Sequence, residues 1–395
     1  MLICGGGAGI PFTFPIITNK VRHVLILGPT GTGKSTLIGA MVTAYTSIPN
    51  ARIFALDIDR SSFVLAHLLN ADYYDVGADG AMPLCPMATM DQPGGEKWLK
   101  GWFERLLGRW PGELNLGGFE LSERESEDFA IDLRRTYRQG GRRLFDLRAN
   151  IHSGEPKRER IRRILSEYID DDAWGYIFNG DKGGNTGGGQ VSVYEVSELM
   201  ELEPRARIPA LELILHNITA SLDGVSPTFI FMDEFWRFLE DETAARWMSN
   251  ALRRLRKKNA GVIASTQSIN EIVASPFKSQ MLESFPAKVL LPNPEAWTNH
   301  VAKNYLDIGI LPHEIALIAS SIPAHDYYFK SASGCRKFTL GLGQIGQSIC
   351  AATSNADVAQ AREIFAQCDP LERLDAWLSA RIPEYESSVS IVDAT

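Results

Sequence analysis

The sequence predicts an α/β fold with a mostly parallel central sheet and an all-helical insertion. Short apolar runs alternate with segments of helical periodicity near both ends of the chain, a pattern typical of parallel strands joined by crossover helices. Between them, from about Glu96 to Trp174, the periodicity is helical, charged residues are dense and there is no good strand candidate. A glycine-rich turn between the first strand and the first helix favours the same fold class.

The first part of the sheet domain is predicted at residues 1–95. Its first strand is an apolar run that ends at Gly28, and the next segment carries apolar residues at helical spacing. The second strand ends in a polar loop, in which Ser61 or Ser62 can cap the following helix. The predicted elements are strands at 24–27, 53–56 and 73–76, and helices at 34–45 and from the capping serine through Leu69.

Changes of pattern set the other predicted boundaries. The all-helical insertion is predicted at 96–178, and turn-forming residues then fill 179–189, which we expect to be a flexible Gly-rich loop at a domain junction. The α/β pattern resumes as the second part of the sheet domain at 190–345, and a C-terminal helical tail is expected at 346–395. The elements predicted here are strands at 190–194, 228–232, 261–265, 288–291, 326–329 and 337–340, and helices at 206–222, 242–258 and 355–378.

Composition limits the class of protein. The 395 residues are 45% hydrophobic and 22% charged, as in ordinary globular proteins. No apolar run approaches the roughly 18 residues of a membrane span, and the chain start lacks the basic beginning of a signal peptide, so we expect a cytoplasmic protein. The net charge of −8 argues against a protein that coats nucleic acid non-specifically. The 5 cysteines and 7 histidines show no ligand spacing, which indicates reduced thiols and no metalloenzyme.

The glycine-rich turn carries the strongest chemical signal. Residues 28–35 read Gly-Pro-Thr-Gly-Thr-Gly-Lys-Ser and match the phosphate-binding motif G-x-x-x-x-G-K-[ST] in full, with a strand before it and a helix after it. Backbone N–H groups of such a loop surround phosphates, and the helix N-terminus adds partial positive charge. We expect Lys34 to reach the β- and γ-phosphates of ATP and Ser35 to bind Mg²⁺. No structural partner for Lys34 is evident. The predicted nucleotide-binding residues are Gly28, Pro29, Thr30, Gly31, Thr32, Gly33, Lys34, Ser35 and Thr36.

Two later strands end in residues suited to the same chemistry. The apolar run 229–232 ends in Asp233 and Glu234, the form of a Walker B segment, although a strand ending in two acids is common. Asp233 is predicted to hold the metal through water, and Glu234 to orient and deprotonate the attacking water. Gln267 follows the strand at 261–264 and can bind both a γ-phosphate oxygen and the water; the alternative is a polar cap on the next helix.

Arginines form a third group of candidates. Arg253, Arg254 and Arg256 end a predicted helix, where cations are ordinary neighbours of the helix dipole, yet an arginine from a neighbouring subunit can also stabilise phosphoryl transfer. Arg336 and Lys337, at the start of a late strand, are a second candidate of this kind.

A further polar group follows the second strand. Asp57, Asp59 and Arg60 lie at the strand end beside the predicted phosphate loop. They are either structural caps or residues that hold the metal ligands in place. Of the three, we favour a functional role for Asp57.

Together these motifs resemble the TrbE/CagE family, the conjugative-transfer ATPases of type IV secretion systems. The resemblance covers roughly residues 11–343. The resemblance rests on Phe12-Thr13-Phe14, the motif at 28–35, Asp57 to Ser61, Met232-Asp233-Glu234-Phe235-Trp236, and Arg256 to Ala260 through Thr266-Gln267. The chain departs from the family after the second strand, where Asp57-Ile58-Asp59-Arg60-Ser61 stands in place of Asp-Lys-Gly-Arg-Ser.

The resemblance implies a RecA-like P-loop NTPase fold with a helical insertion, in the broader FtsK/HerA group. It implies ATP and Mg²⁺ as ligands, Lys34 and Ser35 as Walker A residues, Asp233 and Glu234 as the Walker B pair, and Gln267 as a γ-phosphate sensor. Arg336 resembles the arginine of a late Arg-x-Phe-x-Leu motif. Full-length members carry an N-terminal domain before the motor, so we expect a fragment or a split form.

The predicted function is an ATP-hydrolysing motor that energises pilus assembly and substrate translocation. The family implies a homo-oligomer, hexamer or dimer, on the cytoplasmic face of the bacterial inner membrane. Its expected partners are other secretion-system subunits and a DNA or protein substrate in transit. The alternatives are a DNA-translocating ATPase of the FtsK/HerA type and a nucleotide-binding assembly scaffold with little turnover.

Overall fold

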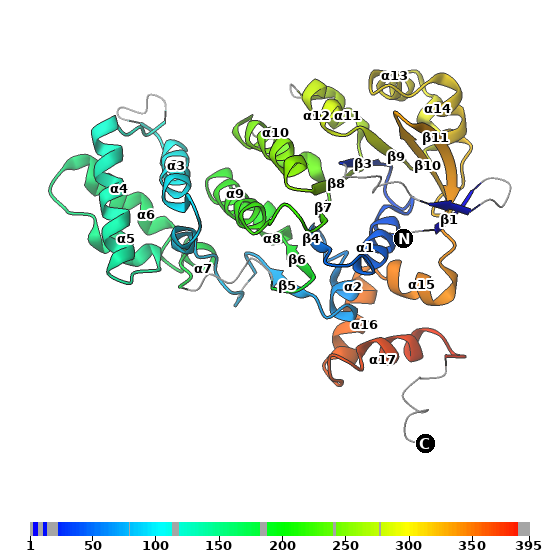
Figure 1. The fold of residues 1–395 in the computed structure, drawn as a ribbon, viewed down its shortest axis with the longest axis horizontal. Coiled ribbons are helices and arrows are strands. Elements are labelled where there is room, and N and C mark those ends of the chain that lie inside the picture. The colour runs from blue at the N-terminus through cyan, green and yellow to red at the C-terminus, as the bar shows by residue number, and fades with distance from the viewer. Residues whose placement is uncertain are drawn as a thin grey trace. The chain divides into compact units, whose positions relative to one another are not determined.

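A computed structural model describes residues 3–6, 11–13, 23–78, 80–112, 118–181, 188–239, 242–275 and 278–385. The chain divides into two compact units (Figure 1). Unit 1 comprises Met1–Tyr73, Gly188–Glu195 and Leu222–Thr395, and unit 2 comprises Tyr74–Gly187 and Val196–Ser221. The expected insertion at 96–178 therefore differs from unit 2, which begins earlier and contains a second segment. The predicted division into domains remains a prediction.

Unit 1 is built on a mixed sheet. Among the described residues the strand order is β2-β1-β11-β10-β9-β3-β8-β7-β4-β6-β5. The strands are β1 (Ile3–Gly6), β2 (Pro11–Thr13), β3 (Val24–Leu27), β4 (Arg52–Asp57), β5 (Asp72–Asp75), β6 (Val191–Glu195), β7 (Thr228–Met232), β8 (Ala260–Thr266), β9 (Ala287–Leu290), β10 (Asp326–Ser331) and β11 (Gly334–Thr339). The block from β9 through β3, β8, β7 and β4 to β6 is parallel, whereas β9, β10, β11, β1 and β2 pair antiparallel.

The parallel block reads as continuous apolar runs because helices cover it. Every residue of β3, β7 and β8 is buried, the pattern expected of parallel strands that are covered on both faces. Leu27 pairs with Thr266 on one side and Leu290 on the other, so the three strands end at one edge of the sheet. This edge, where ligands bind in open α/β sheets, carries the polar residues considered below. The α/β fold class with a mostly parallel central sheet is confirmed.

Helix α1 (Lys34–Thr46) packs on the sheet and completes its core. Leu37, Met41 and Tyr45 of this helix are buried against strand residues such as Phe229 and Phe231, with the Tyr45 ring stacked 4.2 Å from that of Phe229. The other helices of unit 1 are α2 (Phe63–Leu68), η4 (Phe235–Leu239), α10 (Glu242–Lys257), α11 (Ile269–Ala274), α12 (Lys278–Ser284), η5 (Pro294–Trp297), α13 (Asn299–Asp307), α14 (Pro312–Ala319), α15 (Gly343–Cys350), α16 (Asn355–Phe365) and α17 (Arg373–Arg381).

The segment expected as a C-terminal tail packs onto unit 1. Trp377 of α17 is fully buried, and its indole Nε1–H donates to the Ser348 carbonyl at 2.9 Å. Phe365 and Trp377 share an apolar cluster with Phe63 of α2. Residues 373–381 are therefore part of the folded core around α2.

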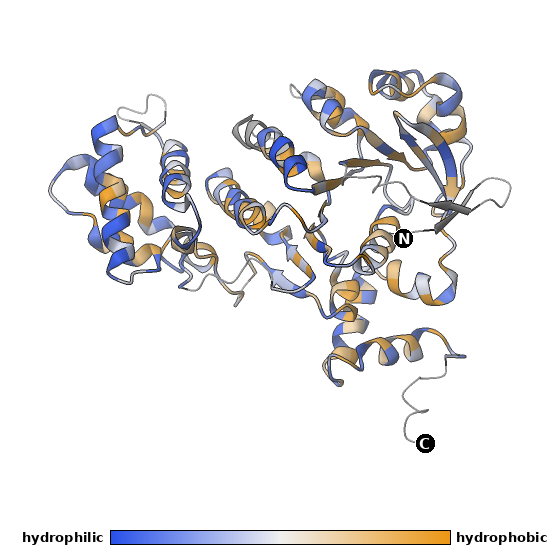
Figure 2. Cartoon of the chain, viewed as in Figure 1, coloured by the Kyte–Doolittle hydropathy of each residue, from blue (hydrophilic) through white to orange (hydrophobic). Residues whose placement is uncertain are grey.

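The described residues of unit 2 are mostly helical, although the last two residues of β5, Tyr74 and Asp75, also fall in this unit. The helices are η2 (Pro86–Asp91), α3 (Gly95–Gly108), α4 (Glu123–Arg138), α5 (Leu144–Asn150), α6 (Pro156–Glu167), α7 (Gly175–Phe178), α8 (Ser197–Met200) and α9 (Pro204–Ala220). Ser122 and Glu125 form a capping box at the start of α4. Hydrophilic and hydrophobic positions alternate along these helices (Figure 2), and the apolar ones meet around the fully buried Trp102 and Phe103.

Across the described ranges, no helix combines the length and the apolar composition that a membrane span needs.

Candidate nucleotide-binding site

The loop between β3 and α1 has the conformation of a phosphate cradle. Gly31 and Gly33 have φ angles of 75° and 100°, in the left-handed region that favours glycine. A Cβ at Gly28 would lie 2.4 Å from the Leu291 Cβ, and one at Gly33 would lie 2.7 Å from the Tyr327 hydroxyl. Close packing therefore requires glycine at 28, and both close packing and backbone geometry require it at 33.

The rim of the cradle is fixed by hydrogen bonds from distant segments. The Gly28 N–H donates to the Thr266 carbonyl at 3.2 Å, and the Ala324 N–H donates to the Thr32 carbonyl at 3.0 Å. The Tyr327 hydroxyl donates to the Gly33 carbonyl at 3.3 Å. At the N-terminus of α1 no side chain caps the helix and no acidic residue occupies the first turn. The partial positive charge of the helix therefore points into a loop shaped for an anion.

Three predicted side chains from separate parts of the chain converge beside this loop. The Lys34 ammonium lies 3.3 Å from Glu234 Oε1, and the Gln267 amide Nε2–H donates to the same oxygen at 2.6 Å. The Thr30 hydroxyl donates to Gln267 Oε1. Lys34 and Glu234 are both buried. The expectation that Lys34 lacks a structural partner is wrong: Glu234 is its ion-pair partner.

Asp233 lies next to this network at the end of β7. Its carboxylate Oδ1 accepts from the Ser265 hydroxyl and, at 3.1 Å, from the Glu234 N–H. Burial raises the pKa of Asp233 above its ordinary value, further assisted by the neighbouring Glu234 and opposed by the Ser265 hydrogen bond and by Lys34. A divalent cation would favour the charged form and reverse that shift.

The residues fit a magnesium–nucleotide complex by their donor chemistry. A Cβ at Gly31 would meet nothing within 4 Å, so the loop is open there, and Lys34 would supply the cation for phosphate oxygens. The Ser35 hydroxyl and the Asp233 carboxylate are oxygen ligands of the kind that Mg²⁺ prefers. Pro29, the second residue of the predicted set, lies in the loop, and Thr36, the last, lies in the first turn of α1. In the described ranges no group of three His, Cys, Asp or Glu side chains could hold a metal ion by itself.

Asp57 organises the loop after β4. Its Oδ1 accepts from the hydroxyls of Ser61 at 2.6 Å and Ser62 at 3.0 Å, and its Oδ2 accepts from the Ser62 N–H at 2.8 Å. The helix that follows has Ser62 at its N-cap, but neither serine caps it with its side chain. The serine hydroxyls instead satisfy a buried carboxyl.

Glu195 completes a buried acidic group that the sequence pattern did not reveal. It pairs with Asp57 across β4 and β6, is fully buried, and accepts from the Arg60 N–H at 2.9 Å. Burial, together with Glu195, raises the pKa of Asp57 well above its ordinary value. Arg60 and Asp59 have positive φ angles of 55° and 62°, which let the loop turn over these acids. The signal available in the sequence was a strand, β6, that ends in an acid as β4 and β7 do.

The arginine candidates lie elsewhere in unit 1. Arg253, Arg254 and Arg256 are exposed at the end of α10. Arg253 and Arg256 line a cavity of about 260 Å³ that also contains His23 and Glu283. Arg336 lies on β11 opposite Phe329, and the neighbouring Lys337 forms an ion pair of 2.7 Å with Asp326.

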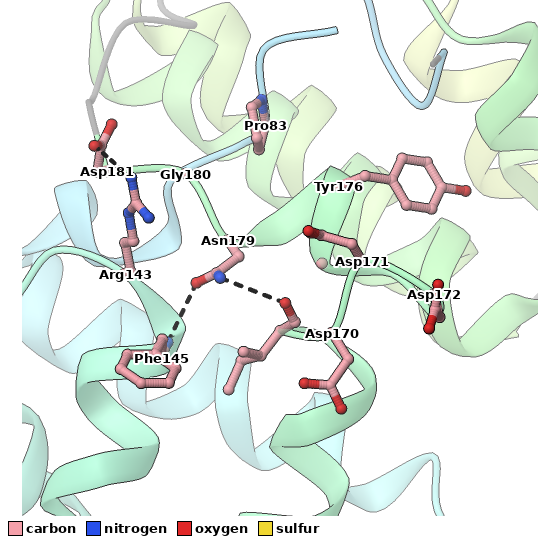
Figure 3. A pocket seen from close by; sticks show the side chains of 12 residues that line it. Pro83, Arg143, Phe145, Asp170, Asp171, Asp172, Tyr176, Asn179, Gly180 and Asp181 are labelled. Carbon is pink, nitrogen blue, oxygen red and sulfur yellow. Dashed lines mark hydrogen bonds and ion pairs between the residues drawn. The ribbon is translucent and has the colours of Figure 1, made fainter. Parts of the chain in front are cut away.

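Another cavity, of about 740 Å³, lies within unit 2 (Figure 3). Arg143 pairs with Asp181 at 2.8 Å on one side of Asn179, and three aspartates, Asp170 to Asp172, lie on the other side. Four carboxylates against one guanidinium repel phosphate groups. This cavity is therefore not a second nucleotide site.

Comparisons with known proteins find relatives that are named for conjugal transfer and type IV secretion. No protein-family model matches it. It is 28% identical over 364 residues to the conjugal transfer protein TrbE of Rhizobium radiobacter, covering 90% of this chain and 43% of that protein. It is 27% identical to a probable conjugal transfer protein TrbE of Sinorhizobium fredii, covering 91% and 53%. It is 23% identical to the type IV secretion system protein virB4 of Bartonella henselae, covering 83% and 40%. The chain thus spans about half the length, or less, of these relatives.

Solved structures share the fold. The structure of VirB4 of Thermoanaerobacter pseudethanolicus superposes with a TM-score of 0.66 at 14% identity, covering 86% of this chain and 96% of that one. The plasmid coupling protein TrwB in complex with ADP and Mg²⁺ superposes with a TM-score of 0.52 at 17% identity, covering 81% and 85%.

Proposed function

Because the chain is a homologue of the TrbE and VirB4 proteins over most of its length, we propose that it is an ATP-hydrolysing motor of a type IV secretion or conjugation system. In this function the free energy of ATP hydrolysis drives pilus assembly and substrate translocation. The proposal rests on sequence similarity for the machine and on the side chains around the phosphate cradle for the chemistry.

The observation that carries the chemistry is the convergence of Lys34, Glu234 and Gln267. They are 200 and 33 residues apart in sequence, yet Glu234 Oε1 contacts both of the others. A lysine, a carboxylate and an amide that meet beside a phosphate cradle supply charge neutralisation, a base for water and a γ-phosphate donor. A nucleotide-binding scaffold would need the cradle and the lysine but not the carboxylate and the amide.

Each residue of the site has its own task in hydrolysis. Lys34 neutralises charge on the β- and γ-phosphates, while the cradle N–H groups hold the phosphate oxygens. Ser35 and, through water, Asp233 would hold Mg²⁺, which would supply further charge neutralisation. Glu234 orients the attacking water and accepts its proton, and Gln267 donates to the γ-phosphate. Asp57 and Glu195 stabilise the loop after β4 by accepting hydrogen bonds from its residues 60–62.

The partners of the motor follow from the relatives. TrbE and virB4 are named as conjugal transfer and type IV secretion proteins, so we infer docking on other secretion subunits at the cytoplasmic face of the bacterial inner membrane. A homo-oligomer, hexamer or dimer, belongs to the same proposal, as does a DNA or protein substrate in transit.

Phosphate release by the purified chain in the presence of ATP and Mg²⁺ tests the proposal. We expect turnover that Lys34→Ala abolishes. Tight ATP binding without phosphate release would contradict it and favour an assembly scaffold. Strong stimulation of turnover by DNA would favour a DNA-translocating ATPase. A pull-down of the intact secretion complex with this chain as bait identifies the machine.

A further inference from the structure

The two oxygens of the Glu234 carboxylate have different kinds of partner. Oε1 is shared by the Lys34 ammonium at 3.3 Å and the Gln267 amide at 2.6 Å. Oε2 accepts from the indole Nε1–H of Trp236 at 2.9 Å. Glu234 is 8% exposed, so these donors, not solvent, set the orientation of its carboxylate.

The three donors differ in what else they can bind. In the proposed function, Lys34 and Gln267 both turn to phosphate oxygens, so both leave Oε1 when ATP binds. The Trp236 indole has one N–H and no acceptor, and among the described residues that N–H donates to Glu234 Oε2. Its hydrogen bond to Oε2 can therefore persist while Oε1 becomes available to water.

The backbone ties this donor to its acceptor. Glu234 has a φ of 43°, uncommon for a residue with a side chain, and its carbonyl accepts from the Arg237 N–H at 3.0 Å at the start of η4. Phe235, between the two partners, is 1% exposed and packs edge-on against Phe285 with ring centroids 5.6 Å apart. The Arg237 guanidinium lies over the Trp236 ring at 5.7 Å. The pair thus sits on one short segment anchored in the core.

We propose that Trp236 is a positioning residue that holds Glu234 by Oε2, so that Oε1 is aimed at the attacking water once Lys34 and Gln267 turn to the phosphates. This inference rests on the proposed ATP hydrolysis. In this role Trp236 acts through the orientation of Glu234 and not on ATP itself.

Trp236→Phe tests this role, because phenylalanine keeps an aromatic ring and removes the N–H. We expect kcat to fall about tenfold, the usual effect of losing one hydrogen bond to a charged group, with KM and the affinity for a non-hydrolysable ATP analogue changed less than about twofold. The control is Trp297→Phe, the same change at an indole residue that is 55% exposed on η5; it should behave as wild type.

A double-mutant cycle separates positioning from general damage. Adding Trp236→Phe to Glu234→Gln should lower the residual rate no further, because the base on which Trp236 acts is already gone. An equal tenfold loss in both backgrounds would overturn the inference, as would a Trp236→Phe enzyme with wild-type kcat.

Indole N–H resonances of the ¹⁵N-labelled chain give a readout that does not depend on turnover. The Trp236 signal should be shifted downfield, should move upfield in Glu234→Gln, and should stay in place when the ATP analogue and Mg²⁺ are added. A Trp236 signal at the position of an exposed indole would overturn the inference even if Trp236→Phe fails to fold. Absence of turnover with this signal shifted would instead contradict the proposed function and leave the Trp236–Glu234 bond established.

Discussion

His23 connects a helix and a strand of unit 1 through both ring nitrogens. Its Nε2 lies 3.0 Å from the Leu252 carbonyl of α10, and the Val262 N–H of β8 donates to its Nδ1 at 2.8 Å. The Leu252 carbonyl can only accept, so the ring carries a proton on Nε2. The Val262 N–H can only donate, so Nδ1 carries no proton and the ring is neutral. Burial lowers the pKa of His23 from 6.5 to about 4, and the nearby Arg256 contributes in the same direction.

This histidine should make unit 1 sensitive to acid. Above pH 6.5 both the folded and unfolded states are neutral at this residue, and the stabilisation is complete. Between pH 6.5 and about 4 only the unfolded state gains a proton. The free energy of unfolding therefore decreases as the pH is lowered, by about 2 kcal/mol from pH 7.5 to pH 5. We expect the destabilisation caused by His23→Gln, measured by urea unfolding, to shrink by that amount over this range. His300→Gln, at an exposed histidine, is the matched control and should show no such change.

Glu234→Gln should retain ATP binding and lose nearly all hydrolysis. The amide keeps the shape of the side chain and its contacts with Gln267 and Trp236 but cannot accept a proton from water, so we expect kcat to fall by a factor of about 10² to 10⁴. Equilibrium binding of a labelled ATP analogue and phosphate release measured on the same preparation check the two halves. Loss of binding would mean that Glu234 acts mainly as a structural partner of Lys34.

The conformation of residues 28–35 could be predicted from sequence because it is local: one strand, one turn and one helix contain the whole motif. The Trp236–Glu234 bond could not, although both residues belong to a motif that was recognised. It depends on the positive φ of Glu234, and glutamate gives no indication in the sequence that its backbone adopts this conformation. Glu195 was missed because its role depends on which strand lies beside β4.

At the scale of elements, the positions of the strands could be predicted from the sequence more easily than whether neighbouring strands run parallel or antiparallel. The predicted strands at 288–291, 326–329 and 337–340 correspond to β9, β10 and β11, but an apolar run does not state whether its neighbour is parallel. The connection between β10 and β11 is short enough for a hairpin, which makes that pair antiparallel. The short helices α11 to α14 were not predicted, since helices of six to nine residues contain too few turns to show a period.

The contact between α1 and α15 yields a prediction at this scale. A Cβ at Gly39 of α1 would lie 3.0 Å from the Cys350 carbonyl oxygen and 3.2 Å from the Cys350 Cα. The two helices can lie this close because residue 39 has no side chain. Gly39→Val should push α15 away and destabilise unit 1 by about 1–3 kcal/mol, measured by chemical denaturation. Gly101→Val in α3 is the matched control, because a Cβ there meets only the flexible end of Arg105 at 3.3 Å, and it should change stability by less than about 0.5 kcal/mol. Equal stability of Gly39→Val and wild type would show that α15 is not packed as described.

At the scale of the whole molecule, the arginines lie far from their own phosphate cradle. Helix α10 ends before β8 begins, whereas the cradle lies beyond the other end of β8, whose 7 residues span about 20 Å. Arg336 pairs with Phe329, which pairs with Val289, which pairs with Ile26 of β3. Three strand spacings of about 4.8 Å therefore separate Arg336 from β3, roughly 14 Å in all. We therefore predict that one of these groups completes the site of a neighbouring chain.

An arginine that serves a neighbouring subunit predicts cooperation between two inactive chains. Lys34→Ala should abolish turnover by removing a cation from the phosphates, and an arginine-to-alanine variant at 253, 254, 256 or 336 should lower it by removing charge from the transition state. When the two variants are mixed, some interfaces pair an intact cradle with an intact arginine, so part of the activity should return and should rise with protein concentration. The pair Lys34→Ala and Glu234→Gln is the matched control: both changes lie in one cradle, so no mixed interface is complete and no activity should return. A rate that is independent of protein concentration, with no recovery for any arginine variant, would show that the site is complete within one chain and that the exposed arginines at the end of α10 serve another purpose.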